Sequence, residues 1–310
     1  MQKSMEKPAV RAAGRRMSRS RQDAILGYML ILPAVILVLL VGILPILNTF
    51  RFSFEYYRLT DIANRHFVGL QNYIALFTTD TNFWDSLRNT FVFAFFSVLL
   101  ELVVGFTGAM LMHRATRGVT AVRAAVLIPW AIPGVIVAQM WGFMFNDQLG
   151  VLNQLLQTLH ITHSNITWLA DGKWAMVAVV LTDTWKQFPF VALMLLAGLQ
   201  TIPRELYEAA EVDGANKVRQ FFAITLPGIK PILLVVLLFR TMGALRIFDI
   251  VYTMTGGGPA NATTTLLLQS YNFFFKDMNY GAGSAMATII FLLIMLISFI
   301  YIRIFKSDEE

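Results

Sequence analysis

The sequence contains no cysteine and few charged residues. Only 14% of its 310 residues are Asp, Glu, Lys or Arg, whereas a soluble domain carries roughly 25%. The lack of cysteine excludes disulfides and thiolate metal sites. The shortage of charge, together with a hydrophobic content of 56%, excludes an ordinary soluble domain and indicates a membrane protein.

Signatures of common enzymes and metal sites are also missing. The sequence has no G-x4-G-K-[ST] phosphate loop, no H-E-x-x-H and no G-x-S-x-G. His160 and His163 stand three residues apart, but a metal site needs more ligands than this pair. We therefore expect no catalytic residue and no metal in this chain.

Six long apolar stretches are present instead, near residues 24–50, 89–112, 122–146, 174–200, 229–254 and 280–304. Each exceeds the about 20 residues that cross a bilayer. Backbone N–H and C=O groups in lipid must form hydrogen bonds within their own segment, because no water is available there. Each stretch is therefore predicted to be a helix. The predicted fold class is all-α: a polytopic membrane protein with six transmembrane helices in one domain, 24–310, after a basic tail, 1–23.

The distribution of positive charge predicts the topology. The net charge is +6, but the Lys and Arg residues flank the apolar stretches, which argues against a nucleic-acid partner. If both termini are cytoplasmic, 16 of the 25 Lys and Arg residues lie inside and 6 outside, as the positive-inside rule requires. Residues 24–50 are uncharged over 27 positions, too long for a typical cleaved signal, so we expect a retained first span.

Loop 201–228 is the main charged interruption between spans, and it is predicted to be cytoplasmic. It carries the pattern E-A-A-x3-G-x9-I-x-L-P without a mismatch. The residues that match are Glu208, Ala209, Ala210, Gly214, Ile224, Leu226 and Pro227. We expect a helix over 203–213, begun by Pro203 and ended by Gly214 in a left-handed conformation, and then a second short helix.

The side chains of this loop favour a protein partner over lipid. Two adjacent alanines let a partner backbone approach closely, and Glu208 offers a charge to a basic group. A helix lying on lipid usually has a basic polar face. This one is acidic, with Glu205, Glu208, Glu211 and Asp213.

The motif resembles the cytoplasmic coupling loop of permeases from binding-protein-dependent ABC sugar importers, of the maltose and trehalose kind with the MetI-like transmembrane fold. The resemblance extends over nearly the whole chain after residue 24. Supporting matches are Arg123-x5-Pro129-Trp130, Gly150-Val151-Leu152-Asn153, Gly198-Leu199-Gln200, Thr255-Gly256-Gly257-Gly258-Pro259, and the order Tyr271, Phe275, Gly281. Val218 departs from the family, since many relatives carry Trp there.

The resemblance implies a larger machine in a prokaryotic cytoplasmic membrane. A second, similar permease would complete the pathway, two ATPase subunits would bind ATP and magnesium, and an extracytoplasmic binding protein would deliver a sugar such as trehalose or maltose. The coupling loop, residues 201–228, would transmit ATPase closure to the helices. No cofactor is expected in this chain itself, and membrane lipid surrounds it.

Charged residues inside the spans mark the expected substrate pathway, because such residues usually face a cavity or a partner. The resemblance places sugar contacts on three spans of this sequence. The residues concerned are Trp130, Gly134, Asp183, Lys186, Gln187 and Arg246. Asp183 with Lys186, and Arg246 with Asp249, are each three residues apart, so two intrahelical ion pairs remain an alternative. Glu101 and Arg240 are interpreted as structural.

Other functions remain open at this stage. A polyol or a glycerol phosphate is the main alternative cargo, because arginines of the fifth span suit a phosphate. A proton-coupled secondary transporter would use Asp183, Asp249 or Glu101 as relay groups, but it needs no E-A-A loop and often shows internal repeats, which we do not find. Uptake that stops with an uncoupler but survives ATP depletion would favour it.

Overall fold

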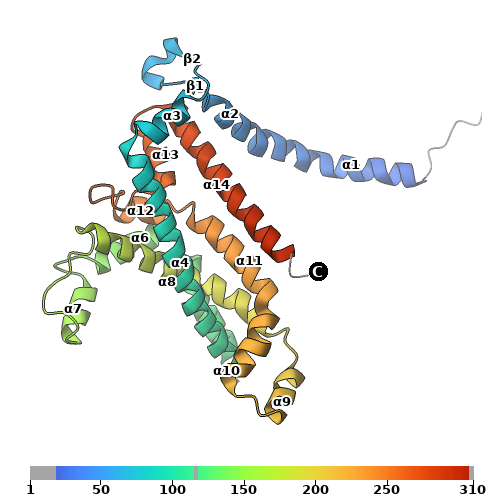
Figure 1. Ribbon diagram of the computed structural model, residues 1–310. Coiled ribbons are helices and arrows are strands. Elements are labelled where there is room, and N and C mark those ends of the chain that lie inside the picture. Colours follow the sequence, from blue (N-terminus) through green and yellow to red (C-terminus); the bar gives the residue numbers. More distant parts are fainter. Residues whose placement is uncertain (1–18, 115–117, 307–310) are drawn as a thin grey trace, which may run out of the picture. The chain divides into compact units, whose positions relative to one another are not determined.

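The computed structural model describes residues 19–114 and 118–306 and is almost entirely helical (Figure 1). The strands in these ranges are β1 (Glu55–Tyr56) and β2 (His66–Phe67), one short antiparallel pair. The all-α class is therefore confirmed. The chain divides into residues 1–48 and 49–310, and each unit is described by itself. Most of the basic tail predicted for 1–23 lies outside the described residues.

The first unit contains most of the first span. Helix α1 (Arg19–Leu37) continues through the π-helical turn η1 (Val38–Ile43) into α2 (Leu44–Phe52). Residues Leu26–Phe52 are long and apolar enough to cross a membrane, two residues later than predicted. The wide π turn directly precedes Pro45, which has no N–H for the normal helical bond.

Two long helices form the centre of the second unit. They are α4 (Thr81–Arg114) and α8 (Gly172–Leu199), which pack against each other. A Cβ on Gly105 would lie 2.7 Å from a methyl of Val191, so glycine allows this close approach, as small residues do in membrane helices. The fifth span, α11 (Leu226–Ala244), packs on both helices.

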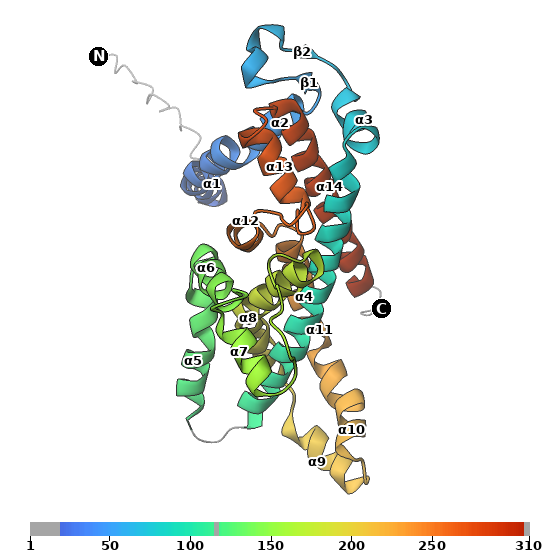
Figure 2. The same cartoon turned by 90° about the vertical axis from the view of Figure 1, so that its left-hand side faces the viewer.

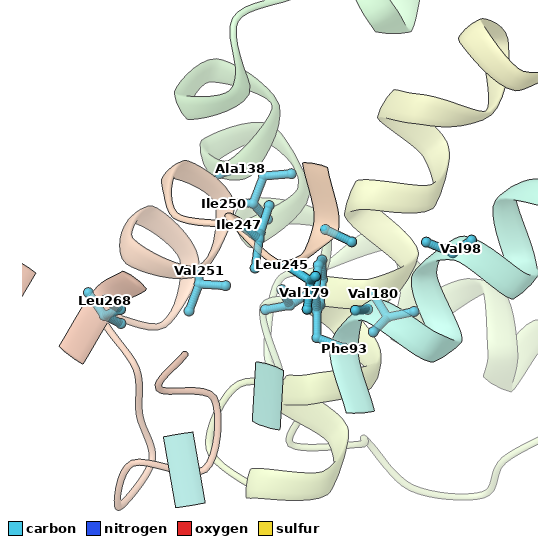
Figure 3. Close-up of a cluster of buried hydrophobic side chains, with 12 residues drawn as sticks. Phe93, Val98, Ala138, Val179, Val180, Leu245, Ile247, Ile250, Val251 and Leu268 are labelled. Carbon is cyan, nitrogen blue, oxygen red and sulfur yellow. The ribbon is translucent and has the colours of Figure 1, made fainter. Parts of the chain in front are cut away.

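A buried apolar cluster joins these helices to three shorter ones. The shorter helices are α6 (Gly134–Met144), α12 (Asp249–Met254) and α13 (Leu266–Phe275). Phe93, Val179 and Leu268 belong to this cluster and are fully buried, and Figure 3 shows Phe93 beside Val179. Residues far apart in sequence thus fix the positions of α6 and α12.

The third span is broken, contrary to the prediction of one helix over 122–146. Helix α5 (Val119–Ala131) ends before Pro133, and the described parts of α5 and α6 meet at 91°. Proline disfavours a helical conformation at the residue before it, and Ile132 is extended, with φ −75° and ψ 134°. The prediction of an apolar stretch is therefore confirmed, but the prediction of one continuous helix is wrong, because the chain turns at Pro133.

The fifth span is also shorter at its C-terminal end than predicted, since α11 ends at Ala244 and α12 begins separately at Asp249. The last span, α14 (Tyr280–Lys306), packs on α13. Within the described residues, five helices meet the length and composition of a span, and the broken α5–α6 pair makes a sixth. The six predicted spans are therefore found, one of them interrupted.

The loops of the second unit gather at opposite ends. Helix α9 (Arg204–Val212), α10 (Lys217–Gln220) and the π turn η3 (Phe221–Thr225) lie at one end. The β1–β2 pair, the 3-10 turn η2 (Leu59–Asn64) and α3 (Gln71–Thr78) lie at the other (Figure 2). Helix α7 (Val151–Thr158) belongs to the loop between α6 and α8.

Candidate functional site

The coupling loop folds into two short helices with a tight turn between them. Pro203 is extended and caps α9, so the helix begins one residue later than predicted. Gly214 has φ +76°, the left-handed conformation predicted for it, which glycine adopts without steric penalty. Asn216 then caps α10 by accepting from the Arg219 amide at 2.8 Å. Local backbone chemistry therefore sets the bend.

One contact attaches this bend to the start of the fifth span, and a second fixes the bend itself. The Tyr207 hydroxyl lies 2.9 Å from Oγ1 of Thr225, at the start of α11. Gln220 is buried, and its Nε2 donates to the Ala215 carbonyl at 3.1 Å. Because η3 continues directly into α11, Tyr207 connects α9 to the start of the fifth span.

The outer surface of the loop is acidic and partly apolar. Arg204 lies 3.1 Å from Glu208, and both side chains are largely exposed. The hydrogen bond from Lys217 to Glu211, with the charge of Lys217, holds the pKa of Glu211 below its ordinary value. Exposed apolar side chains stand beside these acids: Val212, Val218 and Phe222. Such a patch, rimmed by charge, indicates a protein contact.

Lys186 forms hydrogen bonds at the break in the third span. Its ammonium donates to the carbonyls of Ile132 at 2.9 Å and Trp130 at 3.3 Å. Where α5 ends, its last carbonyls have no helical partner. The Lys186 ammonium, in the middle of α8, is the hydrogen-bond donor for these carbonyls. It lies 54 residues from Ile132 and 56 residues from Trp130 in the sequence. The sequence predicted that Lys186 faces the pathway; the structure places it at the helix break.

Asp183 lies in a buried cluster of charges between three spans. Arg240 donates to Glu101 through both Nε and Nη2, the latter at 2.6 Å, and to Asp183 at 3.3 Å. Ser97 lies 2.6 Å from Asp183 and 2.9 Å from Glu101. The three charged side chains are at most 8% exposed. Buried charges need partners of this kind, because desolvation is unfavourable.

The remaining pathway candidates lie near the helix break or on the turn before α12. Gly134 begins α6 directly against the Asp249 carboxylate, with no room for a Cβ. Trp130 is about half exposed and stacks on Phe190. Gln187 is partly buried. Arg246 is exposed, and the hydrogen bond described for its guanidinium is from Nε to the Met242 carbonyl at 3.2 Å.

The structure joins these residues differently from their sequence spacing. Among the described residues, no ion pair links Asp183 to Lys186 or Arg246 to Asp249, so the two intrahelical pairs do not form. Sequence analysis assigned no role to Ser97. The signal that marks it is its position four residues before Glu101 in an apolar helix, the spacing at which two side chains meet.

Six apolar spans, one of them broken, and a structured acidic loop between the fourth and fifth spans define the class: a multi-pass α-helical membrane protein. Residues 90–308 match the family model for the binding-protein-dependent transport system inner membrane component. The chain belongs to this family, whose members are permease subunits of ABC transporters. The MetI-like fold predicted above is confirmed.

Similar proteins cover nearly the whole chain. The trehalose/maltose transport system permease of Thermococcus litoralis is 42% identical, over 93% of this chain and 96% of its own. The sulfoquinovosyl glycerol permease of Agrobacterium fabrum is 40% identical, over 93% and 92%. The crystal structure of a bacterial ABC transporter for import of the acidic polysaccharide alginate aligns with TM-score 0.81 at 21% identity, covering 94% of this chain and 99% of that one.

Proposed function

We propose that this chain is the permease subunit of an ATP-driven importer that moves a sugar, of the size of a di- or oligosaccharide such as trehalose or maltose, across the prokaryotic cytoplasmic membrane. The names of the similar permeases support the cargo, since trehalose/maltose and trehalose systems are 42% and 36% identical to it. The chain itself is non-catalytic in this proposal. ATP and magnesium are bound by a separate ATPase pair.

The coupling loop is the observation that carries the proposal. Its acidic motif is exposed at one end of the bundle and is tied to α11 by Tyr207 and Thr225. An ATPase that contacts Glu208, Ala209 and Ala210 therefore acts on the fifth span. Gly214 shapes the turn, and Ile224, Leu226 and Pro227 continue it into α11. Both termini are cytoplasmic in this arrangement.

The other partners follow from the incomplete pathway. A second, homologous permease closes it from the side, and an extracytoplasmic sugar-binding protein docks at the end that carries β1, β2 and α3. The structural relative that imports alginate was crystallised in complex with an alginate-bound periplasmic protein, which supports this kind of partner. The sugar passes the broken third span and the turn before α12.

Within the pathway the candidate residues take two different roles. We assign direct sugar contacts to Trp130, Gln187 and Arg246, because each is at least partly exposed. A neutral sugar needs hydrogen bonds and an apolar ring face, which these side chains supply. Lys186, Gly134 and Asp183 act by positioning, since their contacts are with the protein itself.

Charge reversal in the coupling loop tests the proposal. In the complex reconstituted in vesicles, Glu208→Lys is expected to lower ATP-driven uptake and sugar-stimulated ATP hydrolysis by about tenfold or more, because like charges across an interface repel by several kcal/mol. Asp277→Lys, an exposed acid in the loop between α13 and α14, controls for the effect of charge reversal on assembly of the complex, because that loop lies at the end where the binding protein is proposed to dock. Normal coupling in Glu208→Lys, or uptake that survives ATP depletion, contradicts the proposal.

A small anionic glycerol derivative is a second candidate cargo, favoured by Arg246. Its exposed guanidinium retains donors that suit a phosphate or sulfonate. Permeases for sulfoquinovosyl glycerol and sn-glycerol-3-phosphate are 40% and 32% identical. Arg246→Gln distinguishes the two cargoes: it should reduce uptake of the anionic solute strongly and trehalose uptake only moderately, because Gln keeps hydrogen-bond donors but loses the charge.

A further inference from the structure

A cavity away from the proposed pathway lies between α4, α8 and the loop 260–262 that follows Pro259. Its volume is about 720 Å³, within the range of roughly 300–1,000 Å³ of small-molecule sites. Neither Lys186 nor Arg246 lines it. The cavity is therefore a separate feature from the helix break and the turn before α12.

The floor of the cavity is apolar. It is formed on α4 by Val92, Phe96 and Leu100, and on α8 by Met176, Val177 and Leu181. These residues lie inside two spans, at a depth where the bilayer is hydrocarbon. A sugar needs hydrogen-bonding groups on all sides, and this floor offers no polar side chain. Its chemistry fits a hydrocarbon chain.

The mouth of the cavity carries charges of both signs at the start of the same two helices. Arg88 and Lys173 are the cations, and Asp85 and Asp171 are the anions. Asp171 accepts from the Lys173 and Trp174 amides through one oxygen only. Within the described ranges, no salt bridge joins either cation to an acid, so both ammonium and guanidinium groups remain available to a ligand.

The rim of the cavity is held in place by the protein. Asn89 donates to the Asn261 carbonyl at 3.0 Å and to the Thr264 carbonyl at 3.1 Å, and Asn261 donates to Asn82 at 3.0 Å. The loop after Pro259 is thereby fixed onto α4, so the cavity is formed before any ligand enters. A ligand there touches α4, α8 and this loop together.

We propose that this groove binds one zwitterionic glycerophospholipid, from the leaflet on the side opposite the coupling loop. The phosphate lies between Arg88 and Lys173, the ammonium faces Asp85 and Asp171, and an acyl chain follows the apolar floor. A membrane helix fits the apolar floor as well, but the charges of both signs at the mouth favour a zwitterionic headgroup. The inference does not depend on which solute is transported.

Photolabelling tests the site directly. The full complex is reconstituted in vesicles that contain phosphatidylethanolamine with a photoreactive acyl chain, and the labelled peptides are mapped by mass spectrometry. We expect preferential labelling of residues 92–100 and 176–181. The double variant Arg88→Ala with Lys173→Ala should lower that labelling by about tenfold or more, because two charge-assisted hydrogen bonds are lost.

A second variant addresses the floor, and two controls address general effects. Val177→Trp fills the groove and should also abolish the preferential labelling, whereas Val103→Trp, on a part of α4 outside the cavity, should not. Lys276→Ala removes a cation that does not line the cavity, so the preferential labelling should persist in this variant. Equal labelling in all variants overturns the proposal. So does a photoreactive residue at position 177 that captures the chain's own residues 24–48 or a second permease instead of lipid.

Discussion

The coupling loop and the buried charge cluster use the same residue types with opposite structural consequences. In the loop, Glu208 pairs with Arg204 four residues away, and both stay in solvent. In the cluster, Glu101 pairs with Arg240, 139 residues away, and both are buried. Exposed pairs contribute little to stability, whereas breaking a buried pair is strongly unfavourable. Charge in the second region joins helices, and we propose that charge in the first serves recognition of a partner.

The largest expected effect is in the cluster. Arg240→Ala leaves Glu101 and Asp183 buried without their cation, which should destabilise the protein by about 3–5 kcal/mol. We expect little assembled permease in the membrane and a marked drop in its thermal unfolding temperature. Arg204→Ala, the matched change in the exposed pair, should alter neither. If both variants unfold alike, the contrast between the two regions is wrong.

Gly134→Ala tests the contact between α6 and α12. A Cβ at this position overlaps the Asp249 carboxylate, and such overpacking costs about 1–3 kcal/mol. Uptake should fall together with thermal stability. Shortening the opposing side chain in the double variant with Asp249→Ala should recover part of both, whereas Gly142→Ala, which has open space around it, should be neutral. No recovery in the double variant would remove the steric explanation.

Lys186→Met tests whether the broken third span needs its ammonium. The carbonyls of Trp130 and Ile132 lose their donor, and an unsatisfied group costs about 1–3 kcal/mol. We expect slower uptake and faster hydrogen exchange around residues 130–134. Gln187→Leu, at the neighbouring position, should leave that exchange unchanged. A Lys186→Met protein with normal exchange but altered sugar preference would instead make Lys186 a direct sugar ligand.

Sequence reasoning succeeded where the physical cause is local. Apolar length identified all six spans, and Gly214 ended α9 in the predicted conformation because glycine tolerates a positive φ. The first helix of the coupling loop, predicted over 203–213, was outlined to within one residue at each end. Apolar length did not predict that the third span is broken, with 91° between its two helices at Pro133, because many membrane helices contain proline without breaking.

The sequence did not predict which distant residues meet. Asp183 was grouped with Lys186 by spacing, but packing of α8 between α4 and α11 turns it toward Ser97 and Arg240. Lys186 likewise reaches the end of α5. Such pairings depend on how whole helices approach each other, through contacts such as Gly105 against Val191, and a single sequence does not specify them.

Glu55, in the loop between α2 and α3, is intermediate between the exposed pair of the coupling loop and the buried charge cluster, and it gives the smallest expected effect. Its carboxylate is buried and accepts from Arg51 at 2.9 Å and from Arg65 at 2.6 Å. Burial alone would raise the pKa of Glu55, but the hydrogen bonds and charges of Arg65 and Arg51 outweigh it and hold the pKa below its ordinary value of 4.5.

A carboxylate whose pKa is lowered by folding stabilises the folded state above its ordinary pKa, and this contribution is lost as the pH falls through the folded value. We therefore expect hydrogen exchange in residues 51–67 to speed up as the pH drops below 4.5, after correction for the intrinsic rate. Glu55→Gln should remove that dependence and leave exchange in the coupling loop unchanged. If exchange in 51–67 stays pH-dependent without Glu55, some other group controls this loop, and the intermediate position of Glu55 between the two regions is lost.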